Sequence, residues 1–264
     1  MSRCRLQPTL GAAIFAVLLA GCALPTLRPQ QDFPQQPGQE TPATTRARIH
    51  TELGAGYYAR GQFDVALEEL NGALKEDSGY APAFGMLGLV YASLREDAKA
   101  EANFQRSIQI NGQDPDVRNN FGWFLCERGR EPQALGQFDL AIQNPFYRTP
   151  EVALVNAGRC AGKLGDRKRA EAYYDKAVNT APTNATAHLA LVELAYRAGD
   201  YAQARTRMRS LANFTAPTAD VLLLGACIER KLDDKAGLES YLAQLSQRFP
   251  SSRELRLADS GTCP

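Results

Sequence analysis

Apolar and small residues recur along this chain with two superimposed periods, one of a helical turn and one of about 34 residues. Within each block they are spaced by three and four residues, which places them on one face of a helix. From residue 53 onward, pairs of adjacent apolar or small residues return in register: Leu53-Gly54, Leu87-Gly88, Phe121-Gly122, Ala157-Gly158, Leu191-Val192 and Leu224-Gly225. A fixed period of this length is typical of architectures built from repeated helix pairs.

A second helix is predicted after each of these first helices. Its small position carries alanine in five blocks, and glycines mark the turn before it: Ala66, Ala100, Ala134, Ala170 and Ala204, with Gly61, Gly129, Gly165 and Gly199. In the sixth block Leu232 is expected where the turn glycine would stand. The pattern resembles the tetratricopeptide repeat.

The fold expected is all-α, a right-handed α-solenoid of six helix–turn–helix repeats. No single helix pair can bury its apolar face alone, so the repeats must stack to form a continuous core. The expected repeats span residues 47–80, 81–114, 115–150, 151–184, 185–217 and 218–250, followed by a C-terminal tail at 251–264.

The N-terminal residues 1–21 have the features of a secretory signal. Arg3 and Arg5 precede an apolar run that ends in small residues and is too short to span a membrane. Leu19-Ala20-Gly21-Cys22 resembles the lipobox of bacterial lipoproteins, which implies cleavage before Cys22 and acylation of that cysteine. The alternative is an ordinary secreted protein with a chance cysteine. Because Ala23 rather than aspartate follows, we expect transport of the lipoprotein to the outer membrane.

Residues 22–46 are predicted to form a tether between the lipid and the folded part. The segment contains five prolines and many Gln and Thr residues, and it has almost no large apolar residue after Leu27. Such a composition cannot bury enough apolar surface to offset the entropy of ordering.

Charge and composition exclude several classes of function. The chain has 30 basic and 29 acidic residues without blocks of like charge, so no basic stripe is present to bind nucleic acid. His50 and His188 fall at packing positions of their repeats, and no cysteine pair has the spacing of a zinc site. We therefore expect no catalytic residues, no metal, no cofactor and no small-molecule substrate, and a protein that is not an enzyme.

Four cysteines of the expected mature chain suggest two disulfides. Cys126 and Cys160 lie on the first helices of adjacent repeats, which pack side by side in a solenoid, so a bridge between them is predicted. Two buried free thiols are the alternative. A second bridge, Cys227 to Cys263, would hold the C-terminal tail on the last repeat and is the less secure prediction.

The resemblance to repeat arrays also implies a concave face that binds partners, lined by fixed positions of the first helices. Those positions hold Tyr58, Leu89, Asn119, Trp123, Arg159, Glu193 and Tyr196. Trp123 is the single tryptophan, and aromatic and Arg side chains are frequent interface anchors. It could equally cover its neighbouring repeat.

The join between the third and fourth repeats carries two extra residues and reads Asn144-Pro145-Phe146-Tyr147-Arg148-Thr149-Pro150. Its two aromatic side chains are costly to leave in water. They either pack back on the solenoid or form a second contact surface, and the sequence leaves both readings open.

Several segments together resemble a narrower family, the PilF/PilW lipoproteins of type IV pilus biogenesis. These segments are Asn119-Asn120-Phe121-Gly122, Phe124-Leu125-Cys126, Asn144-Pro145 with Tyr147, Asn156-Ala157-Gly158 with Cys160, and Leu222-Leu223-Leu224-Gly225. The resemblance implies a pilotin-like scaffold that lies on the inner leaflet of the outer membrane and faces the periplasm. It would bind secretin subunits and help them reach that membrane and form multimers. Two alternatives are a scaffold of another outer-membrane machine, such as β-barrel assembly, and an enzyme or activator in peptidoglycan turnover.

Overall fold

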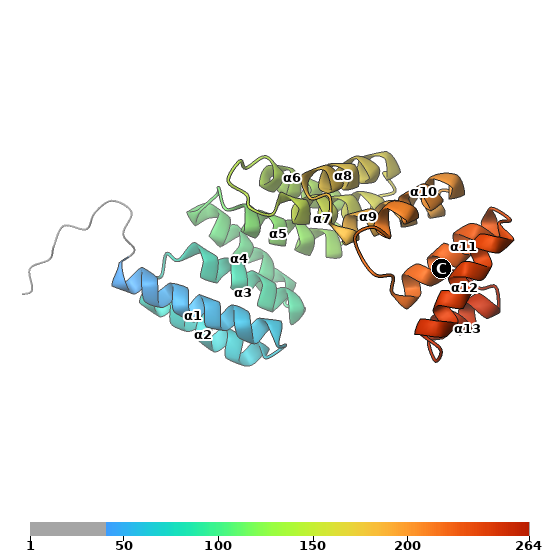
Figure 1. Ribbon diagram of the computed structural model, residues 1–264. Coiled ribbons are helices and arrows are strands. Elements are labelled where there is room, and N and C mark those ends of the chain that lie inside the picture. The colour runs from blue at the N-terminus through green and yellow to red at the C-terminus, as the bar shows by residue number, and fades with distance from the viewer. Residues whose placement is uncertain (1–40, 264) are drawn as a thin grey trace, which may run out of the picture. The chain divides into compact units, whose positions relative to one another are not determined.

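The computed structural model describes residues 41–263, which belong to one compact unit. Cys22, the expected signal peptide and most of the expected tether lie outside the described residues. Within 41–263 the structure contains thirteen α-helices and no strand (Figure 1). The fold class expected from the sequence, an all-α array of helix pairs, is confirmed.

Twelve of the helices form six consecutive pairs, and each pair contacts the next along the chain. The pairs are α1 (Pro42–Ala59) with α2 (Phe63–Glu76), α3 (Ala81–Ser93) with α4 (Asp97–Ile110), α5 (Pro115–Glu127) with α6 (Glu131–Ile142), α7 (Pro150–Lys163) with α8 (Arg167–Thr180), α9 (Ala185–Arg197) with α10 (Tyr201–Leu211), and α11 (Ala219–Lys231) with α12 (Lys235–Arg248). The thirteenth helix, α13 (Arg253–Asp259), lies within the expected tail.

The first helix begins earlier than the sequence pattern suggested. It starts at Pro42, inside the segment expected to be tether, and not at residue 47. The hydroxyl of Thr41 accepts a hydrogen bond from the Thr44 backbone N–H at 3.0 Å and caps the helix. Proline fits the first turn of a helix, where its missing N–H has no partner to lose. The proline interpreted as part of an extended linker is therefore a helix start.

Five of the six pairs are held by a large side chain on the second helix that lies against a glycine of the first. A Cβ atom on Gly88 would stand 2.7 Å from the ring of Phe104, and one on Gly122 would stand 2.8 Å from that of Phe138. The same contact joins Gly54 to Leu70, Gly158 to Tyr174 and Gly225 to Tyr241. The absent Cβ lets the two helices approach closely while the large side chain fills the core between them.

The turns between paired helices use a left-handed residue at a fixed place. Four of these residues are the expected glycines, Gly61, Gly129, Gly165 and Gly199, with φ between 71° and 83°. In the second and sixth repeats Arg95 and Asp233 adopt the same conformation, with φ of 63° and 55°. The left-handed residue of the sixth turn is therefore Asp233, and the expectation that placed Leu232 there is wrong.

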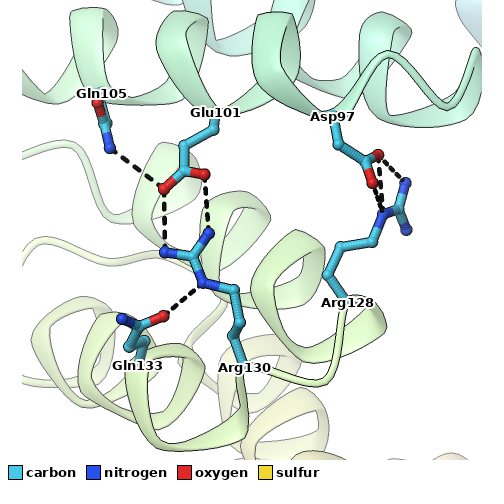
Figure 2. Close-up of polar contacts among 6 residues, drawn as sticks. All are labelled: Asp97, Glu101, Gln105, Arg128, Arg130 and Gln133. Carbon is cyan, nitrogen blue, oxygen red and sulfur yellow. Dashed lines mark hydrogen bonds and ion pairs between the residues drawn. The ribbon is translucent and has the colours of Figure 1, made fainter.

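Ion pairs join neighbouring repeats along α4 and the α5–α6 turn (Figure 2). Arg130 donates hydrogen bonds to both carboxylate oxygens of Glu101, at 2.7 and 3.0 Å. Arg128 donates to Asp97 at 2.8 Å and to the Ala92 carbonyl at 2.9 Å. The hydrogen bond from Arg128 lowers the pKa of the exposed Asp97 carboxyl. These pairs add a polar seam to the apolar stacking of the second repeat on the third.

The C-terminal tail forms a cap on the last repeat. Ala258 of α13 is fully buried in a cluster with Leu222 and Leu245. Arg230 donates a hydrogen bond to the Ala258 carbonyl at 2.8 Å. The short helix thus covers apolar surface that a further repeat would cover in a longer array.

Candidate partner-binding groove

A cavity of about 510 Å³ lies between α7 and α9, with α8 contributing to its lining. Apolar atoms come mainly from Val155, Leu189 and Leu194. Charged groups stand among them: Arg159 and Lys163 from α7, and Glu193 and Arg197 from α9. An apolar pocket with a few polar groups is the usual form of a binding site.

Some of the charged side chains in this cavity have an ion-pair partner and one does not. Lys163 contacts Glu127 of the preceding repeat, and Arg197 donates to Glu193 of its own helix at 2.9 Å. The exposed side chain of Arg159 makes no ion pair or hydrogen bond with any residue of the described chain. Its guanidinium is therefore the cation in this cavity that remains available to a partner.

A smaller cavity of about 130 Å³ continues the groove toward the sixth repeat. The two cavities share Leu189, Glu193 and Arg197, and the smaller one adds Tyr196 and Leu224 to its walls. Burial and the neighbouring Tyr201 raise the pKa of the Tyr196 phenol, while Arg230 acts to lower it. The two cavities thus form one groove along the fourth, fifth and sixth repeats.

Of the seven residues predicted to line a groove, the structure brings Arg159, Glu193 and Tyr196 together at these cavities. Tyr58 and Leu89 lie on α1 and α3, in other repeats. The ring centroid of Tyr58 is 5.9 Å from that of Phe63, and its hydroxyl accepts a hydrogen bond from Ser93. Leu89 is half-buried and packs against the central core cluster.

The two predicted groove residues of α5, Asn119 and Trp123, differ in their exposure to solvent. Asn119 is only 7% exposed, and its amide oxygen accepts a hydrogen bond from Asn156 of α7 at 3.0 Å. It therefore joins two repeats and is not available to a partner as expected. Trp123 is half-buried and packs against the core cluster, which leaves part of its ring at the surface.

In the join between the third and fourth repeats, one aromatic side chain is buried and the other is exposed. The ring of Tyr147 is buried at 8% exposure, and burial raises the pKa of its hydroxyl to about 12. Phe146, by contrast, is 87% exposed. The side chain of Asn144 donates to the Gln113 carbonyl at 2.6 Å and accepts from the Phe146 N–H at 2.9 Å, which fixes the loop.

Both cysteine pairs are bonded in the structure. Cys126 of α5 and Cys160 of α7 form a disulfide with their Cα atoms 5.9 Å apart. Cys227 of α11 is bonded to Cys263, with a Cα separation of 5.8 Å. The first bridge links the third repeat to the fourth, directly beside Arg159, and the second holds the C-terminal cap.

His188 makes packing contacts, whereas His50 is paired with a glutamate carboxylate. His188 is buried, its ring centroid lies 4.8 Å from that of Phe214, and its Nε2 lies 2.9 Å from the Pro182 carbonyl oxygen. His50 contacts Glu69 at 2.7 Å. Residues 41–263 contain no group of three or more potential ligands that could hold a metal ion. In the same residues, no helix combines the length and apolar character needed to cross a membrane.

The other residues of the groove were not predicted, among them Lys163, Tyr174, Leu189 and Arg197. Tyr174 stands at the position where the second and third repeats carry Phe104 and Phe138, which pack in the core. The added hydroxyl relative to Phe was the signal available in the sequence. Lys163 and Arg197 carried no such signal, because a charged residue near a helix end is common on any solvated surface.

Two pilus proteins resemble this chain over most of its length. The type IV pilus assembly protein PilF of Pseudomonas aeruginosa is 26% identical over 242 residues, which cover 91% of this chain and 93% of PilF. The crystal structure of PilW, a widely conserved type IV pilus biogenesis factor, aligns with a TM-score of 0.71 at 31% identity and covers 80% of this chain and 96% of PilW. A Pseudomonas aeruginosa PilF structure has the same fold, with a TM-score of 0.72 at 24% identity over 84% of this chain and 100% of its own.

Models of the tetratricopeptide repeat match residues 51–116 and 163–227. Together with six stacked helix pairs they define a tetratricopeptide repeat protein, a class of non-catalytic proteins that bind other proteins. The chain belongs to the PilF/PilW family of type IV pilus biogenesis proteins.

Proposed function

We propose that this protein is a lipid-anchored scaffold of the outer membrane that binds secretin subunits of the type IV pilus in its groove. It would face the periplasm from the inner leaflet and promote both the localisation of the secretin and its assembly into multimers. The observation that carries the proposal is that the chain belongs to the PilF/PilW family. Its groove holds the unpaired guanidinium of Arg159 among apolar side chains.

The groove supports binding of a protein segment. Its two cavities are continuous over three repeats, which suits an extended chain or a helix. The disulfide between Cys126 and Cys160 and the hydrogen bond between Asn119 and Asn156 hold α5 and α7 together beside it. A preformed surface of this kind loses little conformational entropy when a partner binds.

The sequence before the repeats supports the anchor. Leu19-Ala20-Gly21-Cys22 carries the features of a lipobox, and acyl chains on Cys22 would anchor a protein that has no need of a transmembrane helix. Placing the groove at the membrane confines the encounter with secretin subunits to a surface. The anchor therefore determines the location and the groove determines the partner.

The groove is tested with Arg159→Ala and Tyr196→Ala in the full-length protein. We expect fewer heat-stable secretin multimers on gels in both variants, with the protein still exported and folded. Lys168→Ala, which removes an exposed charge from α8 outside the groove, is the matched control and should leave the multimers unchanged. Normal multimers in both groove variants would remove these residues from the proposed site.

The anchor is tested with Cys22→Ser. This change should leave the unfolding curve unaltered while the protein leaves the outer-membrane fraction and secretin multimers fail to accumulate there. Co-purification with a β-barrel assembly factor, in place of the secretin, would instead assign the scaffold to another outer-membrane machine.

A further inference from the structure

Tyr174 carries a hydroxyl that its packing does not require. Its ring lies against Gly158 as those of Phe104 and Phe138 lie against their glycines. The residue is only 8% exposed, yet it lines the 510 Å³ cavity. No described residue hydrogen-bonds its hydroxyl. Phenylalanine suffices for the packing in two other repeats, so the hydroxyl is an unused donor at the floor of the cavity.

Gly162 keeps the wall of the same cavity open. It stands four residues after Gly158, in register with Tyr58 and Tyr196 of the first and fifth repeats. A Cβ atom there would meet nothing within 4 Å, so close packing does not require glycine. Glycine inside a helix costs about 0.5–1 kcal/mol relative to alanine. The residue leaves space where the first and fifth repeats place a tyrosine.

The charge of the cavity fits one anionic group. Lys163 and Arg197 are each paired with a glutamate, which leaves Arg159 as the uncompensated cation. Burial raises the pKa of the Tyr174 phenol, and the nearby Arg159 only partly opposes this. The hydroxyl therefore remains protonated at neutral pH and can donate a hydrogen bond.

The smaller cavity indicates which kind of side chain lies near the anionic group in the bound segment. It shares walls with the first and is lined by Leu189, Tyr196, Val221 and Leu224 together with the charged side chains of Glu193, Arg197 and Asp220. An apolar side chain can pack against its apolar walls. A segment that occupies both cavities extends along the groove from the Arg159 site, so its anion can be carried by a side chain within the segment.

We propose that the cavity between α7 and α9 binds the carboxylate of an Asp or Glu side chain within an extended segment of a partner protein. Arg159 and the hydroxyl of Tyr174 hold the carboxylate, Gly162 leaves room for the segment, and an apolar side chain nearby in the segment enters the smaller cavity. The identity of the segment as part of a pilus protein rests on the function proposed above, whereas the chemistry of recognition does not.

The test uses the full-length protein in detergent and a short synthetic peptide, acetyl-Gly-Ser-Leu-Gly-Asp-Gly-Leu-Ser-Gly-amide, in isothermal titration. The peptide reads the same from Asp in both directions, so it presents an apolar side chain whichever way it lies. Replacing its Asp with Asn should weaken binding about tenfold or more, since a hydrogen bond to a charged group contributes about 1.5–3 kcal/mol. Equal binding of the two peptides, or binding of neither, would overturn the proposal.

Four variants locate the site. Arg159→Gln should weaken the Asp peptide about tenfold or more. Tyr174→Phe should weaken it about threefold to tenfold while leaving the unfolding midpoint unchanged, because Phe already fills this slot in two repeats. Gly162→Tyr should abolish binding and Gly162→Ala should retain it. Unaltered affinity in both Arg159→Gln and Gly162→Tyr would show that the peptide binds elsewhere.

Three further outcomes test the inference, and the last two separate it from the proposed function. A peptide with Asn in place of Asp and a free C-terminal carboxylate should bind no better than its amide, and stronger binding would overturn the assignment to a side chain. Secretin binding without any preference for the Asp peptide would overturn this inference alone. A clear preference for the Asp peptide without any secretin complex would overturn the proposed partner alone.

Discussion

The ring of Tyr174 lies directly against the backbone of Gly158, where a Cβ atom would stand 2.5 Å from the ring carbon Cε1. Four other repeats have the same relationship between a glycine of the first helix and a large side chain of the second. The contact fixes how these five helix pairs close. In the fourth repeat the same tyrosine also lines the larger cavity of the groove.

Gly158→Ala should destabilise the protein by about 1–3 kcal/mol, because the added methyl group overlaps a ring that the core holds in place. Gly136→Ala is the matched control: Gly136 lies in α6, is exposed and has nothing within 4 Å of a built Cβ. That substitution should stabilise by about 0.5–1 kcal/mol. Urea unfolding followed by circular dichroism measures both, and equal effects would contradict the packing argument.

Arg95→Gly should stabilise the protein. Arg95 adopts φ of 63° in the turn between α3 and α4, a conformation that costs a residue with a Cβ about 1–2 kcal/mol. Glycine removes that cost but adds freedom to the unfolded chain, so a net gain of about 0.5–1 kcal/mol is expected. Gly129→Ala, at the equivalent place in the next repeat, should have the opposite sign. A lower urea midpoint for Arg95→Gly would refute this account of the turn.

Removing the disulfide between the third and fourth repeats should cost about 3–4 kcal/mol. Cys126 and Cys160 are 34 residues apart, and their bond restricts an unfolded loop of that length. The double variant Cys126→Ala, Cys160→Ala is compared with Cys227→Ala, Cys263→Ala by denaturant unfolding. Four free thiols in the denatured, unreduced wild-type protein would show that neither bond forms.

Stability should fall at high pH partly through Tyr147. Its pKa is raised from 10.0 to about 12, mainly by burial, so folding favours the neutral phenol. The stabilising contribution is fully present below pH 10.0 and is lost as the pH rises through about 12. Between about pH 9 and about pH 11 the loss from this group is about 1 kcal/mol. Tyr147→Phe should lose less stability than wild type over this interval, and parallel curves would contradict the assignment.

Much of the fold could be predicted from residue spacing, because a solenoid places its defining contacts within one repeat or between adjacent ones. Gly88 and Phe104 are 16 residues apart, so the pattern that repeats in the sequence is the pattern that packs. The start of α1 was misplaced since Pro42 is compatible with both a linker and a first helical turn.

The candidate site was less accessible to prediction. Arg159, Glu193 and Tyr196 were placed correctly on the groove by their register, but Asn119 was not, because its amide contacts Asn156 in the next repeat. Register gives the direction of a side chain and does not reveal its hydrogen-bond partner. Tyr174 was not predicted, because its repeat position is a packing position in other repeats, although here it also lines the cavity.

The sequence by itself determined the repeat and the pairing of helices, and it predicted the bridge between Cys126 and Cys160. These features depend on residues whose spacing is short or periodic. The lipobox resemblance around Cys22 stays a prediction. Only the tertiary structure decided which groove cation lacks a partner, where a missing side chain at Gly162 leaves space, and that Tyr174 lines the groove as well as the core. Those properties depend on contacts among side chains of three different helices. The periodicity of the sequence does not reveal such contacts.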